Sequence, residues 1–185
     1  MEPGRAERDR QLLIIFRLIA EGRLSGLSDL YDVLGRKLFG YIRALVKSTI
    51  DAEDVLQEVF TKLAENRRKL VKVRNPRAYL FAMARNESLR LLKDHSRAKV
   101  TEPDHPMLET VAPGKKEPAL SPREAQAALQ RLPAEQREVI VLKIYEEFTF
   151  EEIGALTEVS PNTAASRYRY GLAKLAESLK RHRGA

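Results

Sequence analysis

The chain has 185 residues, enough for one or two domains with apolar cores of their own, and it carries a formal net charge of +7. Such an excess of cations favours an acidic partner, nucleic acid before membrane. No cysteine is present, which excludes disulfide bonds, thiolate catalysis and cysteine-ligated zinc. The charged first ten residues are no secretory signal, and the longest early apolar run, Leu12 to Phe16, is too short to span a membrane. We therefore expect a soluble, cytoplasmic protein without membrane insertion.

Apolar residues recur at helical spacing through the first 96 residues, and no segment sustains the alternation typical of a strand. We expect four helices in this part of the chain. They are one that ends at Gly22, a long one over residues 27–45, one capped by Asp51, and one opened by Asn75 and Pro76. Together with the helical patterns near the C-terminus, this predicts an all-α fold.

A proline-rich interval separates two groups of predicted helices. Residues 96–122 contain five of the nine prolines and few large apolar side chains. A segment of this composition is typical of an extended, flexible linker. The sequence therefore predicts an N-terminal helical domain over about residues 8–96, a linker over 97–121 and a C-terminal helical domain over 122–182.

The last third of the chain has the spacing of a helix-turn-helix. We expect a short helix over residues 150–156, a turn over 157–160, and a longer helix with Ser160 as N-cap and Pro161 in first position. One face of the longer helix is apolar, through Ala164, Tyr168, Leu172, Leu175 and Leu179. The opposite face carries Asn162, Ser166 and Arg169, with Arg167 on its border. Such groups suit contact with a DNA major groove, and the alternative is an amphipathic hairpin with a solvated basic side.

Charge is distributed unevenly along the chain. Residues 67–99 hold eleven Lys or Arg against two acidic residues, and residues 163–185 hold six against one. Residues 51–65 hold five acidic residues and one Lys. This pattern indicates two surfaces suited to phosphate and one suited to a basic protein.

Two blocks of sequence resemble the sigma-70 family of bacterial RNA polymerase sigma factors, in its small extracytoplasmic-function (ECF) type. Residues 51–60, with 75–80 and 84–86, are similar to sigma regions 2.2, 2.3 and 2.4. Residues 129–137, 150–154 and 163–167 are similar to sigma region 4. The blocks span about three quarters of the chain in the family's order. The resemblance implies two helical domains, region 2-like and region 4-like, joined by a linker.

The resemblance also implies a role for each charged surface. Asp54, Gln57 and Glu58 correspond to the face that docks on the β′ clamp helices of core RNA polymerase, although an acidic run on its own is typical of a solvated helix face. Further expected partners are the polymerase β flap, promoter DNA and an anti-sigma factor. The residues that we expect to contact the melted −10 element are Arg74, Arg77, Arg85, Asn86 and Arg90.

The residues that we expect at the −35 element are Asn162, Ser166, Arg167 and Arg169, with Lys174 further along on phosphate. The sequence departs from the family's pattern in the turn, where Thr157 and Glu158 replace a usual Leu and Gly. A left-handed Glu costs about 1 kcal/mol relative to Gly, which leaves the shape of the turn open. Tyr79 stands where the family often has Trp, and core packing is favoured over base stacking for it. Asn86 has a structural hydrogen bond as its alternative role.

Other classes of function fit the sequence less well. No Gly-rich phosphate loop and no His-Glu-x-x-His motif is present, and the three histidines are scattered, so we expect neither an enzyme nor a metal or cofactor site. A stand-alone helix-turn-helix repressor or activator would need neither the acidic face nor a melting module. A sigma-like decoy would tend to lose the basic residues that this chain retains, such as Arg85 and Arg167.

Overall fold

The computed structural model describes residues 4–23, 25–99 and 122–183, and within these ranges every regular element is a helix or helical turn. The all-α prediction is therefore confirmed. Of the predicted linker, residues 100–121 lie outside the described residues, whereas 97–99 form the end of a long helix.

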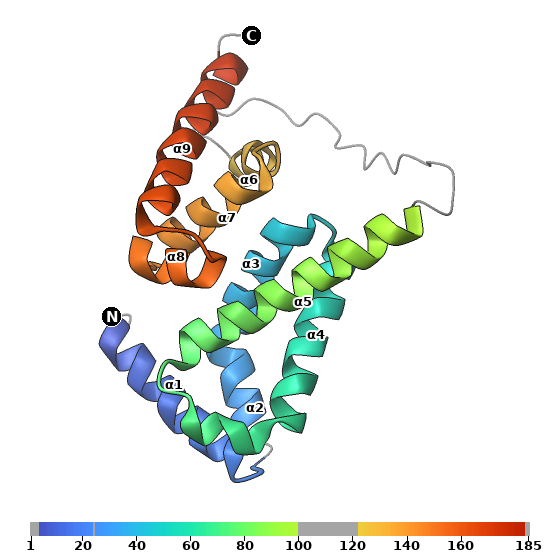
Figure 1. The fold of residues 1–185 in the computed structure, drawn as a ribbon, viewed down its shortest axis with the longest axis vertical. Helices are drawn as coiled ribbons and strands as arrows, with labels where there is room; N and C mark the ends of the chain where they lie inside the picture. The colour runs from blue at the N-terminus through green and yellow to red at the C-terminus, as the bar shows by residue number, and fades with distance from the viewer. Residues whose placement is uncertain (1–3, 24, 100–121, 184–185) are drawn as a thin grey trace.

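The helices form two bundles (Figure 1). The N-terminal bundle consists of α1 (Arg5–Ala20), α2 (Ser25–Leu30), the π-helical η1 (Tyr31–Gly35), α3 (Arg36–Val46), α4 (Thr49–Glu65), the 3-10 turn η2 (Arg67–Lys72) and α5 (Pro76–Lys99). The C-terminal bundle consists of α6 (Pro122–Gln130), α7 (Ala134–Ile140), the π-helical η3 (Val141–Tyr145), α8 (Phe150–Thr157) and α9 (Pro161–Arg183). Helices α7 and α8 of the second bundle pack against α3 and α5 of the first.

Side-chain caps fix where several helices begin. Asn75 Oδ1 accepts the Ala78 N–H at 3.0 Å, and Ser160 Oγ accepts the Thr163 N–H at 3.0 Å, so both predicted N-caps are confirmed. The prediction of Asp51 as a cap was wrong. Ser48 has the extended backbone of an N-cap and accepts the Asp51 N–H at 3.2 Å, which places Asp51 in the first turn of α4. There its carboxylate complements the helix dipole instead.

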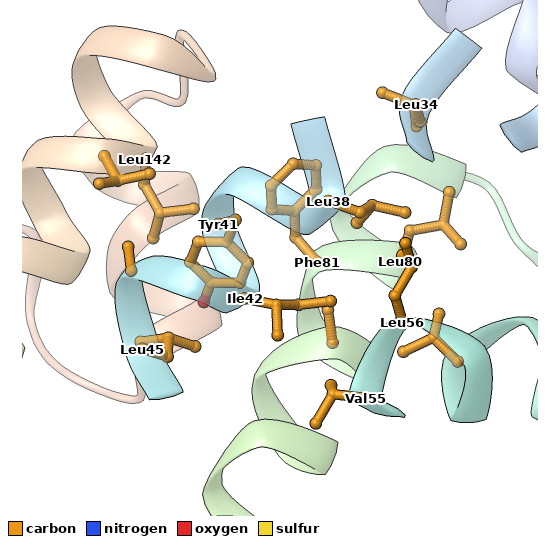
Figure 2. Packing of buried hydrophobic residues seen from close by; sticks show 14 of the residues in the cluster. Leu34, Leu38, Tyr41, Ile42, Leu45, Val55, Leu56, Leu80, Phe81 and Leu142 are labelled. Carbon is orange, nitrogen blue, oxygen red and sulfur yellow. The ribbon is translucent and has the colours of Figure 1, made fainter. Parts of the chain in front are cut away.

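The two bundles share one apolar core. The ring of Tyr41 in α3 lies 5.1 Å from that of Phe81 in α5, which lies 5.2 Å from that of Phe148, between η3 and α8 of the C-terminal bundle. Leu142 of η3 packs beside Tyr41 in the same cluster (Figure 2). All four side chains are almost completely buried, so the contact between the bundles has an apolar centre comparable to a domain interior.

The helix-turn-helix itself is formed by α8 and α9. A capping box at Thr149 and Glu152 starts α8, and Glu158 ends it in the left-handed conformation, with φ 60° and ψ 39°. Gly154 lies under the turn, where an added Cβ would be 2.7 Å from the Val159 carbonyl oxygen. Only glycine allows α8 and the turn to approach each other this closely.

We expect Glu158→Gly to raise the free energy of unfolding by about 1 kcal/mol, because glycine adopts a left-handed conformation without strain against a Cβ. The exposed Ala155 in α8 supplies the matched control. There the same introduction of glycine, Ala155→Gly, should lower stability by a similar amount. Chemical denaturation of both variants measures the two signs, and a loss of stability in Glu158→Gly would contradict the explanation.

Candidate nucleic-acid interface

The first surface lies on α9. Asn162, Ser166 and Arg169 line an open pocket of about 410 Å³, together with Phe150, Ala165 and Tyr168. The rings of Phe150 and Tyr168 meet edge to face at 5.6 Å and hold α9 against α8 beneath the polar groups. Arg169 also donates a hydrogen bond to Ser166 Oγ at 3.2 Å. The predicted polar face of the second helix is thus assembled and open to a ligand.

Two other predicted residues of α9 lie outside this pocket. Arg167 is half-buried beside α7, where its Nη2 lies 3.0 Å from Glu135 Oε2, as expected of a residue on the border of the polar face. Lys174 is exposed further along the helix. The structure therefore brings three of the five predicted −35 residues together and holds Arg167 in an ion pair.

The second surface lies around the start of α5. Arg74 and Asn86 are exposed, and Asn86 thus shows no sign of the buried structural role that was its alternative. Arg90 is exposed but is engaged by two carboxylates, Glu87 at 2.9 Å and Glu58 at 3.5 Å. Tyr79 packs edge to face on Phe16 at 6.2 Å and belongs to the margin of the core, as predicted.

The remaining two residues of the predicted −10 set are covered by the C-terminal bundle. Arg85 Nε donates to Glu138 Oε1 in α7 at 2.9 Å, and its side chain is only 17% exposed. Arg77 is 8% exposed, and its guanidinium carbon lies 4.2 Å from the centre of the Phe148 ring. Burial lowers the pKa of Arg77 from its ordinary value, and Arg5 nearby adds to this effect.

Glu138 is the centre of a small buried polar network. Its Oε1 accepts hydrogen bonds from Arg85 and from the hydroxyl of Tyr41, the latter at 2.8 Å. Burial raises the pKa of Tyr41 well above its ordinary value, and the adjacent negative charge of Glu138 raises it further. Both donors come from the N-terminal bundle, so one carboxylate of α7 joins α3 and α5.

Arg137, beside Glu138, is almost completely buried. It donates to the carbonyl oxygen of Ala44 in α3, and its Nη1 donates to the carbonyl oxygens of Gln130 at 3.2 Å and Leu132 at 2.8 Å. Burial lowers its pKa from the ordinary value. The sequence patterns assign no role to Arg137 or Glu138. Their burial could have been inferred from their position directly before the apolar run Val139–Leu142, where a helix is buried on most sides.

The acidic face of α4 is open on the side away from the core. Asp54 and Gln57 are exposed, and Glu58 is partly exposed while it contacts Lys62 at 3.4 Å and Arg90 at 3.5 Å. The apolar stripe of the same helix, with Val55 and Val59, is buried as predicted. This arrangement leaves two groups accessible to a basic partner surface.

Together, these features define a helical DNA-binding protein with a helix-turn-helix and a second basic surface. Residues 30–98 match the family Sigma-70 region 2, and residues 123–175 match the family Sigma-70, region 4. The chain is 30% identical over 161 residues to the RNA polymerase sigma factor CarQ of Myxococcus xanthus, which covers 86% of this chain and 92% of that protein. The chain therefore belongs to the sigma-70 family of RNA polymerase sigma factors, in its ECF type. Members act as non-catalytic factors in transcription initiation.

Solved structures agree with this assignment. The fold is similar to that of the sigma factor RpoE in complex with the anti-sigma factor NepR from Bartonella quintana, with a TM-score of 0.69 and 28% identity over 83% of this chain and 95% of that one. It is also similar to CnrH in complex with the cytosolic domain of CnrY, with a TM-score of 0.63. That match covers 94% of this chain and 97% of the other at 22% identity, and it supports the fold alone.

The part of the chain that the structure describes contains neither a metal-binding cluster nor a membrane span. No group of three or more His, Asp or Glu side chains there is placed to hold a metal ion. Among the same residues, none of the helices is both long enough and apolar enough to cross a membrane.

Glu146 is a buried carboxylate between the bundles, and its Oε2 has no hydrogen-bond partner. Burial raises its pKa to about 7, although Lys37 of α3, Arg77 of α5 and Arg8 of α1 lower it, and Glu147 raises it. Of these cations, Lys37 has its Nζ 4.0 Å from the carboxylate. Because the pKa is higher in the folded chain than in the unfolded one, protonated Glu146 favours folding. Its contribution is complete below the ordinary pKa and is lost as pH rises towards 7.

We expect Glu146→Gln to stabilise the chain at about pH 8, by on the order of 2 kcal/mol. At about pH 5 the effect should be small, because Glu146 is already protonated in most of the folded molecules. Thermal unfolding of wild type and variant at the two pH values measures the difference. Glu53→Gln, at an exposed position of α4, provides the control and should shift the unfolding temperature by the same small amount at both pH values. An effect of Glu146→Gln that does not change with pH would contradict the interpretation.

Proposed function

We propose that the chain directs core RNA polymerase to specific promoters and assists in melting the −10 element. In this proposal the N-terminal domain, about residues 8–96, contacts core polymerase and the −10 element. The C-terminal domain, about residues 122–182, contacts the −35 element and the polymerase β flap. The observation that carries the proposal is the open pocket on α9, where Asn162, Ser166 and Arg169 converge on a helix that the helix-turn-helix presents outward.

The −35 element is read by this face of α9. An amide, a hydroxyl and a guanidinium provide both donors and acceptors, which is what the edges of bases in a major groove require. Asn162 lies in the first turn of α9 and Arg169 in the third, and both are exposed in the N-terminal half of the helix, the part of a recognition helix that contacts bases. Lys174 lies further along the helix and contacts phosphate, and Arg167 joins it once released from Glu135.

The −10 element is held as a single strand by Arg74, Arg77, Arg85, Asn86 and Arg90. Cations neutralise the phosphates of the strand, and the Asn86 amide is available for a base edge. No covalent chemistry is needed, because capture of unstacked bases at a few kcal/mol each shifts the melting equilibrium towards the open form.

Core polymerase is bound through the acidic face of α4. Asp54 and Gln57 are accessible there, and Glu58 lies beside them. Carboxylates next to an amide suit a basic partner helix, such as the β′ clamp helices. The structural neighbour RpoE is in complex with an anti-sigma factor, and we propose that an anti-sigma factor regulates this chain as well.

We expect the double variant Asp54→Ala, Gln57→Ala to lose most of its affinity for core polymerase while keeping the wild-type unfolding transition, because both side chains are exposed. Glu58 is left in place, since its removal would also strip Arg90 of a partner. Asp29→Ala, the loss of an exposed carboxylate on α2, is the control for net charge. Binding measured by fluorescence anisotropy at several salt concentrations decides the matter, and wild-type affinity in the double variant would remove α4 as the docking face.

We expect Asn162→Ala and Arg169→Ala each to reduce discrimination between the preferred −35 duplex and altered duplexes by ~1–3 kcal/mol. Lys174→Ala should instead weaken binding about equally for all duplexes and reduce the salt dependence by roughly one phosphate contact. Competition binding with a set of single-base variants separates the two patterns. Equal, sequence-independent losses in all three variants would contradict base reading by this face.

The proposed function as a whole is tested by transcription with purified protein and core polymerase on a library of duplex promoters. Specific transcripts with a shared −10 and −35 pattern are the expected result. Core binding without initiation would favour a decoy, and duplex binding without core would favour a stand-alone repressor or activator.

A further inference from the structure

Glu87 is a buried carboxylate on α5 at the contact with α4. Its Oε1 accepts a hydrogen bond from Lys62 Nζ of α4 at 2.5 Å. Its Oε2 accepts one from Nε of Arg90, about one turn further along α5, at 2.9 Å. Each carboxylate oxygen therefore has a cation of its own, as a buried charge requires. The sequence patterns assign no role to Glu87 or to Lys62.

Glu58 of α4 completes a network of two carboxylates and two cations. Its Oε1 lies 3.4 Å from Lys62 Nζ and 3.5 Å from Arg90 Nη2. The exposed fraction of the side chain increases across the network, from 10% for Glu87 through 30% for Lys62 and 40% for Glu58 to 59% for Arg90. The network thus extends from the buried contact of the two helices to the surface. Its most exposed member, Arg90, is one of the residues that the proposed function assigns to the −10 strand.

We propose that Glu87 is a positioning residue for the −10 strand, in that it holds the Arg90 guanidinium through Nε and leaves the donors on the two Nη atoms for a phosphate. Arg90 is the residue that contacts DNA, and Glu87 acts through it. The inference rests on the proposed function, because it requires that Arg90 contact the −10 strand.

The benefit of such an anchor is conformational. An exposed arginine has several rotatable bonds, and a strand that binds it must restrict them at a cost in entropy. A bond to Nε fixes the plane of the guanidinium, and the paired Nη donors match the oxygens of a phosphate only when that plane is correctly oriented. Arg90 is therefore restricted when the chain folds rather than when the strand binds, and this raises its affinity for a phosphate.

Glu87 is better suited to this role than Glu58 because of where the two carboxylates lie. Glu58 belongs to the acidic face that is proposed to bind core polymerase, so a basic partner helix competes with Arg90 for it. Its contact with Arg90 is also long, at 3.5 Å, and such exposed pairs contribute little. Because Glu87 is buried, the polymerase cannot reach it, and Arg90 keeps this partner when α4 is docked.

The test compares Glu87→Gln with Asp94→Asn, a change at an exposed carboxylate about one turn beyond Arg90, in the full chain. Both changes remove one negative charge from α5, and by charge alone both should raise the affinity for DNA slightly. We expect Asp94→Asn to do so. Glu87→Gln should instead lower the affinity, by roughly three- to tenfold, because the guanidinium is no longer held.

The probe is a fluorescein-labelled oligo(dT) strand, since a phosphate contact does not depend on base sequence. Fluorescence anisotropy at low salt measures its binding to the chain alone and to the chain bound to core polymerase, with core polymerase alone as the blank.

Changes at Arg90 show whether the loss acts through this residue. In the Arg90→Ala background, Glu87→Gln should no longer lower the affinity, because no guanidinium remains to be held. Arg90→Lys keeps the charge, but a single ammonium group cannot both bind Glu87 and present a fork to a phosphate. It should bind the strand about as weakly as Glu87→Gln does. Because position 90 is exposed, this variant supplies the test if Glu87→Gln fails to fold by circular dichroism. Wild-type affinity in Arg90→Lys would overturn the positioning role.

The pairing of Glu87 with Arg90 is measured separately, without DNA. Urea unfolding of wild type, Glu87→Gln, Arg90→Ala and the double variant forms a cycle, in which the double variant should lose less stability than the two single variants together. Additive losses would show that Glu87 does not hold Arg90 and would overturn the proposal. Coupled losses, with a strand affinity in Glu87→Gln no lower than in Asp94→Asn, would overturn its role in DNA binding. If wild type binds no strand, either alone or with core polymerase, the −10 assignment fails and the positioning role fails with it, whereas the cycle still shows whether the pair is formed.

Discussion

A guanidinium buried at the ends of two helices determines how the bundles sit against each other. Arg137 has no room for water and must place its donors within the protein, since an unpaired buried charge would be prohibitive. The acceptors it finds are carbonyls at the C-terminal ends of α3 and α6, where helix dipoles concentrate partial negative charge. With Arg137 fixed in this way, the next residue on α7, Glu138, is brought to Tyr41 and Arg85. The relation of the C-terminal bundle to α3 and α5 follows from these two neighbouring charges.

The apolar and polar parts of this contact do different work. Phe81, Phe148 and Leu142 exclude water, which is favourable in any arrangement that buries them. The buried charges add little net stability, because their desolvation offsets their attraction, but they penalise every arrangement that leaves one of them unpaired. Glu146 is an exception to this pairing of buried charges, since one of its oxygens is buried without a hydrogen bond. The apolar side chains thus supply the attraction of this contact, and the charged ones fix its geometry.

Local features of the fold were predictable from sequence, whereas the pairing across the bundles was not. The caps at Asn75 and Ser160 and the apolar face of α9 depend on residues a few positions apart, and short-range patterns reveal them. Ser48 was missed because Asp51 is also a good capping residue, and only the backbone conformation distinguishes the two. Arg85 and Glu138 are 53 residues apart, and no periodicity connects them. The pattern correctly placed Arg85 on a helix but could not show which other surface covers it.

The two surfaces assigned to DNA differ in availability within one closed chain. The polar face of α9 is open, and its pocket is supported by Phe150 and Tyr168 from within the C-terminal bundle alone. The surface on α5 is divided, with Arg74 and Asn86 exposed and Arg77 and Arg85 covered. Within the proposed function, the polar face of α9 is therefore the surface that the closed chain leaves fully open to a duplex. On α5, the guanidinium of Arg85 is already paired with the carboxylate of Glu138, which offers the same kind of charged oxygen acceptor as a phosphate.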